Sequence, residues 1–192
     1  MKKHILIFLT LMLMSLFVGC QKNTTNELKT SKTTNESNEE KVQKKIYKQN
    51  EEAFITNKNG ENIYSLTINS AKEVNVPTDY VGDMPKDTKK LLVLTYTFKY
   101  INEDKHLDTL NVSPSDLQVF DENGMAIRLI DLGASDYPFD SDVFLSDGIN
   151  AGRTKQVYAA FSLTNDIPSI QVDFNSTTFG KKLTFELPIE VQ

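Results

Sequence analysis

The sequence predicts an all-β fold, an antiparallel β-sandwich of seven or eight strands, over residues 46–192. Apolar and polar residues alternate in several short segments of this region, which is the period of a strand with one buried face. Turn-forming residues separate the segments, as in sandwiches built from short strands. No helical pattern is longer than a single turn expected at Ser113–Asp116, where a serine N-cap precedes a proline in the first helical position.

The clearest strand lies within residues 91–100, where every even position is Leu, Tyr or Phe and the odd positions become polar towards the end. The same alternation predicts strands around residues 64–68, 157–163, 170–174 and 183–189. Pro188 has no N–H to donate to a neighbouring strand, so we expect the last of these strands at a sheet edge.

Two Asn-Gly dipeptides predict hairpins. Asn123-Gly124 lies between apolar runs at residues 117–120 and 125–130, and Asn-Gly in that position is a strong signal for the tight turn of a β-hairpin. Asn59-Gly60 closes a second expected hairpin, between the apolar pair Phe54-Ile55 and the segment that follows it. These turns support antiparallel pairing of neighbouring strands.

The first nineteen residues have the features of a signal peptide. Lys2 and Lys3 give a basic start, and the fourteen residues Ile5–Val18 are almost entirely apolar. As a helix they would extend about 21 Å, less than the roughly 30 Å of bilayer hydrocarbon. This length fits a cleaved segment better than a permanent membrane span, so residues 1–19 are predicted to be a signal peptide.

The end of this segment, Phe17-Val18-Gly19-Cys20, resembles the lipobox of bacterial lipoproteins. In that family the cysteine thiol receives a diacylglycerol group, and the chain is cut just before the cysteine. Gly19 and Cys20 match the pattern, whereas Phe17 stands where leucine is usual. The resemblance implies signal cleavage between Gly19 and Cys20 and lipidation of Cys20, with the covalent diacylglycerol as the only non-protein group. Two acyl chains give a stable membrane anchor.

Cys20 is the only cysteine, so the chain can form no intrachain disulfide. The alternative to lipidation is an ordinary secreted protein that has a cysteine at this position by chance. Residues 20–45 are expected to be the lipidated cysteine and a flexible tether. Leu28 and Val42 are the only sizeable apolar residues after Cys20 in that range, too few to offset the entropy lost on ordering.

The expected domain, residues 46–192, contains 13 lysines and arginines and 22 aspartates and glutamates, a net charge of −9. A domain of this charge is repelled by the phosphates of nucleic acids and by anionic lipid headgroups. We therefore expect no nucleic-acid partner. We also expect the domain to be held at the membrane by its lipid anchor and not by charge.

Three stretches, LLVLTYTFKYINEDK, SDLQVFDENGMAI and INAGRTKQVYAAFSLTNDIPSIQVDF, resemble immunoglobulin-like domains of Gram-positive surface lipoproteins, a family largely of unknown function. The residues at the matching places of the family pattern are Asn102, Asp121, Gly124, Gly152 and Phe161. In outline the chain is also similar to the secreted immunoprotective antigen of mycobacteria. The resemblance covers about residues 62–190. It implies an immunoglobulin-like sandwich outside the cell membrane and carries over no catalytic residue.

Residue types on which common catalytic sites depend are scarce. After signal removal His106 is the only histidine, and we interpret it as a solvated loop residue and not as a base or metal ligand. The sequence contains no Ser-x-x-Lys motif and no phosphate-binding glycine loop. Paired carboxylates are the one catalytic arrangement that the composition leaves open. Because the other residue types and motifs of catalytic and metal sites are scarce, we expect no enzymatic activity and no metal site.

The best candidate contact surface is the long segment from Asp131 to Gly152, which combines aromatic and acidic side chains. Long loops in compact domains are often functional. The candidate partner-binding residues are Tyr137, Phe139, Asp140, Asp142 and Phe144. Alternatively, the two phenylalanines close the end of the sandwich and the acids keep the loop soluble. Clustered carboxylates would also suit Ca²⁺, but the EF-hand spacing is absent. Val76–Asp87 is a second, weaker candidate.

Together these features predict a lipid-anchored protein at the outer face of the membrane, whose domain binds a protein or cell-wall partner without catalysis. The alternative is an accessory lipoprotein that binds a small ligand or a divalent cation. A deep apolar pocket would favour this alternative, and a flat surface with exposed aromatic residues would favour protein binding. A third idea is that Leu13–Gly19 is released as a peptide pheromone, as from some other lipoprotein signals.

Overall fold

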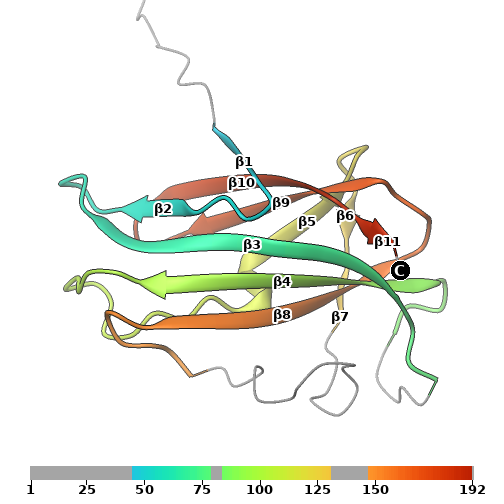
Figure 1. Cartoon of the computed structure of the whole chain (residues 1–192), viewed down its shortest axis with the longest axis horizontal. Helices are drawn as coiled ribbons and strands as arrows, with labels where there is room; N and C mark the ends of the chain where they lie inside the picture. Colours follow the sequence, from blue (N-terminus) through green and yellow to red (C-terminus); the bar gives the residue numbers. More distant parts are fainter. Residues whose placement is uncertain (1–44, 79–83, 131–146, 192) are drawn as a thin grey trace, which may run out of the picture. The chain divides into compact units, whose positions relative to one another are not determined.

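Two β-sheets face each other in the computed structural model, which describes residues 45–78, 84–130 and 147–191 (Figure 1). The five-stranded sheet has the order β1 (Ile46–Lys48), β10 (Lys181–Pro188), β9 (Ser169–Ser176), β5 (Leu117–Asp121) and β6 (Ala126–Ile127). The six-stranded sheet has the order β11 (Glu190–Val191), β3 (Asn62–Asn75), β4 (Lys90–Tyr100), β8 (Thr154–Leu163) and β7 (Leu129–Ile130), with β2 (Ala53–Thr56) paired to β3. The predicted β-sandwich is confirmed.

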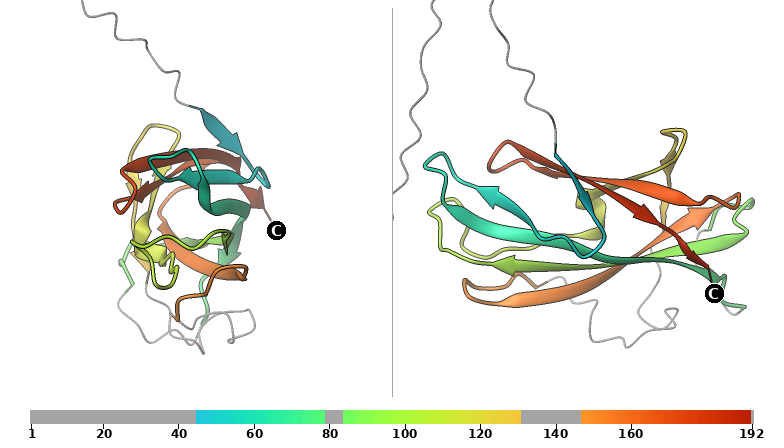
Figure 2. Two further views of the ribbon diagram at one scale, coloured as in Figure 1. Left: turned by 90° about the vertical axis from the view of Figure 1, so that its left-hand side faces the viewer. Right: turned by 45° about the horizontal axis from the view of Figure 1, so that its top comes forward.

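The strand count agrees with the expected seven or eight. Seven strands have four or more residues, and β1, β6, β7 and β11 have only two or three. Most pairs are antiparallel. The exceptions are β1 with β10 and β11 with β3, which run in parallel along the margins of the two layers seen in Figure 2. These short parallel strands escaped the sequence prediction because two or three residues are too few to display a period.

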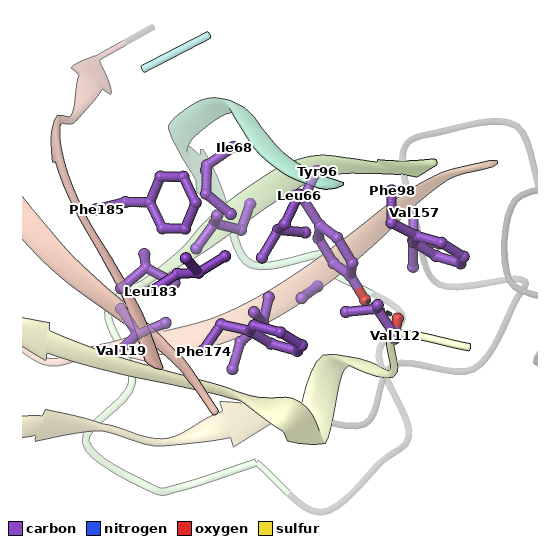
Figure 3. Close-up of a cluster of buried hydrophobic side chains, with 14 of the residues drawn as sticks. Leu66, Ile68, Tyr96, Phe98, Val112, Val119, Val157, Phe174, Leu183 and Phe185 are labelled. Atoms are coloured by element: carbon purple, nitrogen blue, oxygen red, sulfur yellow. Dashed lines mark hydrogen bonds between the residues drawn. The ribbon is translucent and has the colours of Figure 1, made fainter. Parts of the chain in front are cut away.

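The alternation predicted from the sequence fills the space between the sheets (Figure 3). The buried side chains that meet there include Leu66, Ile68, Tyr96 and Phe98 from the six-stranded sheet and Val119, Phe174, Leu183 and Phe185 from the five-stranded sheet. Burying a side chain of this size stabilises the fold by about 1.5–3 kcal/mol. The one polar atom of Tyr96 is satisfied, because its hydroxyl donates to the carbonyl oxygen of Val112 at 2.8 Å.

The strand β3 extends beyond the predicted segment 64–68. The prediction stops there because the alternation of inward and outward side chains changes phase after Ile68. The pairing of β3 with β4 shifts register between Ile68 and Ser70, and a bulge of this kind exchanges the two faces of a strand. Beyond it Glu73 is buried, with its carboxylate paired to the ammonium group of Lys90. A buried charge persists when it has such a partner.

A second buried cluster lies on the other face of the six-stranded sheet. Its members are Val74, Leu91, Val93, Ile130 and Ala160. Leu91 and Val93 alternate with Leu92 and Leu94 of the main core, so their side chains point to the opposite face of β4. The apolar run Leu91–Leu94 is thus buried on both faces of the strand.

Both predicted Asn-Gly hairpins are confirmed: β2 pairs with β3 and β5 pairs with β6 in antiparallel fashion. Gly60 and Gly124 have φ angles of 83° and 78°, a conformation that glycine adopts without steric cost. The expected helical turn is the 3₁₀ helix η1 (Pro114–Asp116), which is closed by a capping box between Ser113 and Asp116.

The prediction that the last apolar strand is a sheet edge is wrong. β1 pairs with β10 from Thr184 to Glu186, so β1 and β6 form the edges of the five-stranded sheet. Pro188 is tolerated because it is the last residue of β10, beyond the residues that β1 contacts, where that neighbour requires no N–H.

The predicted signal peptide, residues 1–19, lies outside the described residues, and so do residues 20–44 of the predicted tether. The expected start of the domain at residue 46 coincides with the first residue of β1, but the boundaries at 19 and 45 stay predictions. Within the described ranges no helix has the length and apolar character needed to cross a bilayer.

Tyr64 provides a pH-dependent test of the packing. Its side chain is 4% exposed and its ring contacts Phe174 and Phe179 edge-on. Burial raises the pKa of Tyr64 from 10.0 to about 12. Below pH 10 the phenol is neutral in both states; between pH 10 and 12 the unfolded chain ionises first, so folding should lose about 2–3 kcal/mol from this residue.

We therefore expect Tyr64→Phe to remove that part of the alkaline loss, measured as the difference in free energy of unfolding from pH 9 to pH 12 in urea titrations. Identical slopes for wild type and Tyr64→Phe would contradict the assignment.

Candidate functional site

The residues predicted to bind a partner lie outside the described part of the chain. They are Tyr137, Phe139, Asp140, Asp142 and Phe144, within residues 131–146. Gly19 and Cys20, the predicted cleavage and lipidation site, lie within residues 1–44 and are likewise not described. All of these assignments stay predictions. The described residues bring together other side chains.

His106 lies on an exposed turn closed by a bridge between Asp104 and Leu107. Its backbone N–H donates to the Asp104 carboxylate at 3.0 Å. This position agrees with the interpretation of His106 as a solvated loop residue. Among the described residues, no group of three or more His, Cys, Asp and Glu side chains is placed to hold a metal ion.

The side chains in the interior of the sandwich are at most 9% exposed, and three hollows described here lie at the surface. The largest of those described here, which we call the trough, covers about 860 Å³ on the outer face of the five-stranded sheet. A smaller one, the end cleft, measures about 340 Å³ at the end of the sandwich where β8 finishes. A third, the loop recess, measures about 410 Å³ between residues 103–108 and Asn150-Ala151.

The trough is built on one row of residues that crosses four strands. Lys48 of β1 is opposite Glu186 of β10, Glu186 is opposite Gln171 of β9, and Gln171 is opposite Phe120 of β5. These positions alternate with the buried Phe185, so their side chains point away from the core. The hairpin turn 121–124 closes one end of the row.

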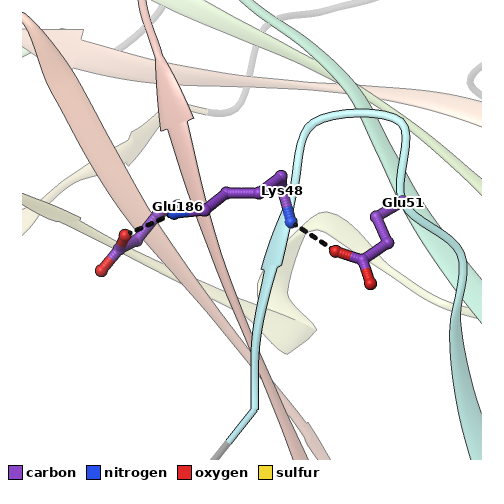
Figure 4. A network of polar contacts seen from close by, with 3 residues as sticks. All are labelled: Lys48, Glu51 and Glu186. Carbon is purple, nitrogen blue, oxygen red and sulfur yellow. Dashed lines mark hydrogen bonds and ion pairs between the residues drawn. The ribbon is translucent and has the colours of Figure 1, made fainter.

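Ion pairs neutralise the lysines of this face. The Lys48 ammonium contacts the Glu186 carboxylate at 2.9 Å, and the backbone N–H of Lys48 donates to Glu51 at 3.1 Å (Figure 4). Hydrogen bonds from the side chain of Lys45 and the backbone of Lys48 hold the pKa of the Glu51 carboxyl below its ordinary value. Lys48 therefore connects β1 to Glu186 of β10. Lys45 and Lys48 both connect the start of the domain to Glu51, which follows β1.

Asp173 is the buried charge of the same face. Its side chain is 5% exposed, and its two oxygens accept from the Thr184 hydroxyl at 2.6 Å and the Lys182 ammonium at 2.5 Å. The remaining acids of the trough, Asp121 and Glu122, form no ion pair with a described residue. Since every lysine on this face is matched to a carboxylate, these two acids leave the trough with a net negative charge.

The end cleft lies where the chain crosses from one sheet to the other. Arg128 separates β6 from β7, and its carbonyl oxygen accepts from the Ser162 N–H at 2.8 Å. Ser162 in turn shares a hydrogen bond of 2.6 Å with the Thr88 hydroxyl. The side chain of Met125, at the tip of the β5–β6 hairpin, is 68% exposed at the rim.

The trough and the end cleft could not be located from the sequence. Lys48, Gln171 and Glu186 each occupy an ordinary polar position of a strand, and only the strand order places them side by side. The alternation predicted from the sequence does indicate that the side chains of Gln171 and Glu186 face outward. Arg128 follows a short apolar run and has no sequence signal of its own.

No known protein family and no curated protein sequence matches the chain. Solved structures share its fold. YcdA of Bacillus subtilis, which carries a provisional lipoprotein assignment, is 15% identical over 73% of this chain with a TM-score of 0.52, and the chain spans only 38% of YcdA. MPT63, a secreted protein of Mycobacterium tuberculosis, is 16% identical over 77% of this chain and 98% of its own, with a TM-score of 0.53.

The YjhA protein of Bacillus subtilis is 12% identical, over 76% of this chain and all of its own, with a TM-score of 0.52. At these identities the likeness concerns the fold. The immunoglobulin-like sandwich inferred from the sequence resemblance is confirmed: the chain shares its fold with YcdA, which has a provisional lipoprotein assignment, and with the secreted protein MPT63.

The loop recess depends on a close approach of two segments, which gives a second test. A Cβ atom at Gly148 would lie 2.5 Å from the Thr109 Oγ1 and 2.8 Å from its Cβ, beside the bridge between Leu110 and Ile149. Gly148→Ala should therefore destabilise the protein by about 1–3 kcal/mol through overpacking, measured by urea unfolding.

Thr109→Gly removes both clashing atoms and should recover most of the loss when combined with Gly148→Ala. Additive effects of the two substitutions in a double-mutant cycle would show that the approach of these segments is not the cause.

Proposed function

We propose that the chain is an extracellular protein, anchored to the outer face of the membrane by a diacylglycerol on Cys20, whose sandwich binds a protein or cell-wall partner without catalysis. The N-terminal sequence supports the anchor, because a short apolar segment ends at the only cysteine. The fold that the chain shares with YcdA and MPT63 is compatible with a location outside the cell.

The observation that carries the binding role is the trough on the outer face of the five-stranded sheet. The three hollows of the described part that are named above offer binding space at its surface. The trough is the most extensive hollow described above, and it is formed by regular strands that hold their side chains in fixed rows. Sites on strands are positioned more rigidly than sites on loops.

The charge of the trough indicates the chemistry of the partner. Asp121 and Glu122 are not matched by a basic side chain of the described residues, and the whole domain has a net charge of −9. A negative field accelerates the approach of cationic groups and repels anions. The partner we propose therefore presents lysine or arginine side chains, or other ammonium groups, to this face.

The ion pairs of the trough can be exchanged at little cost. The side chains of Lys48 and Glu186 are 66% and 46% exposed, and exposed pairs of this kind contribute only about 0–1 kcal/mol. A cationic group of the partner can displace Lys48 from Glu186 without a large penalty. The trough can therefore accept a basic partner without refolding.

The accessory role with a small ligand remains the second candidate, and the end cleft is the observation that favours it. Its volume of about 340 Å³ lies at the lower end of the range for small-molecule sites, about 300–1,000 Å³. A role with a divalent cation has no supporting cluster within the described residues.

The anchor predicts a change of location. Cys20→Ala removes the thiol to which the lipid is attached, so the protein should move from the membrane fraction to the medium or accumulate as unprocessed precursor. Cell fractionation followed by immunoblotting measures this, with Ser15→Ala in the apolar segment as the control. Mature Cys20→Ala protein at the wild-type level in the membrane fraction would refute the lipid anchor.

The trough predicts charge-dependent contact on intact cells. A photo-crosslinking residue at Gln171, in the centre of the trough, should capture its partner. Glu122→Lys combined with Glu186→Lys should lower the adduct yield roughly tenfold, because each charge reversal opposes a basic partner. Glu61→Lys combined with Glu103→Lys changes the net charge equally but lies outside the trough lining, and should leave the yield unchanged. An equal loss in both pairs would refute the trough as the contact surface.

A further inference from the structure

The end cleft combines groups of opposite charge beside an apolar wall. The wall comes from Met125 and Ile127 of the β5–β6 hairpin and from Leu163 and Ile167 at the end of β8 and the turn after it. The charged groups at the cleft are Arg128, Asp87 and Asp121. The end cleft differs from the trough in its cation, because Arg128 has no carboxylate partner among the described residues, whereas Lys48 of the trough is paired with Glu186.

Among the described residues, Arg128 is the only cation that lines the end cleft, and it is one of two arginines in the chain. Its backbone is held in the β7–β8 pairing through the bond to Ser162, whereas its side chain is exposed and forms no ion pair with a described residue. A guanidinium group is planar and binds carboxylates through two parallel hydrogen bonds. Arg128 therefore combines a backbone that is held in place with a guanidinium group that no described residue occupies, and this group can bind a carboxylate.

Asp121 is also held in place. Its Oδ1 accepts from the backbone N–H groups of Asn123 at 2.9 Å and Met125 at 2.8 Å. These bonds leave its second oxygen without a donor among the described residues. Asp87, from the segment before β4, brings a second carboxylate to the cleft. Both are acceptors for an ammonium group.

The charges decide which ligand fits. A ligand with only a carboxylate would be attracted by Arg128 but repelled by the two aspartates. A ligand with only an ammonium group would be attracted by the aspartates but repelled by Arg128. A molecule with an ammonium group and a carboxylate satisfies all three residues. The volume of the end cleft, about 340 Å³, is at the lower end of the range for small-molecule sites and suits an amino acid with a large side chain or a dipeptide.

The exposed Met125 points to an apolar side chain on the ligand. At 68% exposure it is one of the few large apolar side chains of the described residues that face solvent. Methionine adapts its shape to different partners. An apolar group laid against Met125 would remove both surfaces from water, at about 25 cal/mol for each Å² buried.

We propose that the end cleft binds an apolar amino acid or dipeptide in its zwitterionic form, with the carboxylate on Arg128, the ammonium group on Asp87 and Asp121, and the apolar side chain against Met125. This site is separate from the trough except for Asp121, and it does not depend on the partner proposed there.

The test uses leucyl-leucine as the probe and the full mature chain as the protein. Titration calorimetry should detect binding of the dipeptide. The carboxyl-amidated and the N-acetylated forms each lack one charge and should bind about tenfold more weakly, because each leaves one receptor of the cleft unpaired. Backbone amide NMR shifts should change at Met125 and Ser162 and not at the loop recess.

Variants assign the two charges. Arg128→Gln should weaken leucyl-leucine about tenfold and leave the amidated form unaffected, since that form has no carboxylate to lose. Asp87→Asn should weaken leucyl-leucine and spare the acetylated form. Arg153→Gln, which changes the other arginine, is the control and should bind as wild type. Circular dichroism checks that each variant is folded.

The proposal is overturned if leucyl-leucine causes no heat change and no shift at Met125 or Ser162. It is also overturned if the blocked forms bind as tightly as the free dipeptide, or if Arg153→Gln weakens binding as much as Arg128→Gln. Any of these results would leave the trough proposal intact, because the trough test does not involve Arg128.

Discussion

The packing of aromatic and aliphatic side chains between the two sheets is the constraint on which the rest of the structure depends. Tyr96 and Phe98 of β4 face Phe174 and Phe185 of the other sheet, all nearly inaccessible to solvent. The three hollows described above all lie at the surface, so the recognition that we propose involves the outer surfaces of the sandwich. The core fixes the rows in which outward-facing side chains stand, and so it also determines the geometry of the trough.

The edges of the sandwich connect this core to the proposed role. β1 is the first strand after the predicted tether, and it lies beside β10 through parallel pairing, through Tyr47 packed against Phe185 with ring centres 5.4 Å apart, and through the Lys48–Glu186 ion pair. The same strand borders the trough. At the other side of this sheet, the crossing from β6 to β7 places Arg128 in the end cleft. Both candidate sites thus arise where short strands complete the sheets.

The long strands and their turns could be predicted because each depends on local signals: the alternation in 91–100, the two Asn-Gly hairpins and the serine cap of η1. The short strand β1 could not be, since three residues display no period. β10 was expected at an edge because Pro188 has no N–H to donate, but β1 pairs with β10 only as far as Glu186, so the proline does not exclude this neighbour. The bulge after Ile68 could not be predicted either, because residues 69–75 are mostly polar and do not continue the alternation of large apolar residues. The candidate sites depend on the strand order, which brings Lys48, Glu186 and Gln171 together from distant parts of the chain.

The proposed role depends on a diacylglycerol attached to Cys20 that holds the protein at the outer face of the membrane. Intact mass spectrometry of the protein extracted from the membranes of its own cells tests this most directly. The account predicts a chain that begins at Cys20 and carries the added mass of a diacylglycerol on that residue. A chain that begins at Met1, with an unmodified thiol at Cys20, would contradict it.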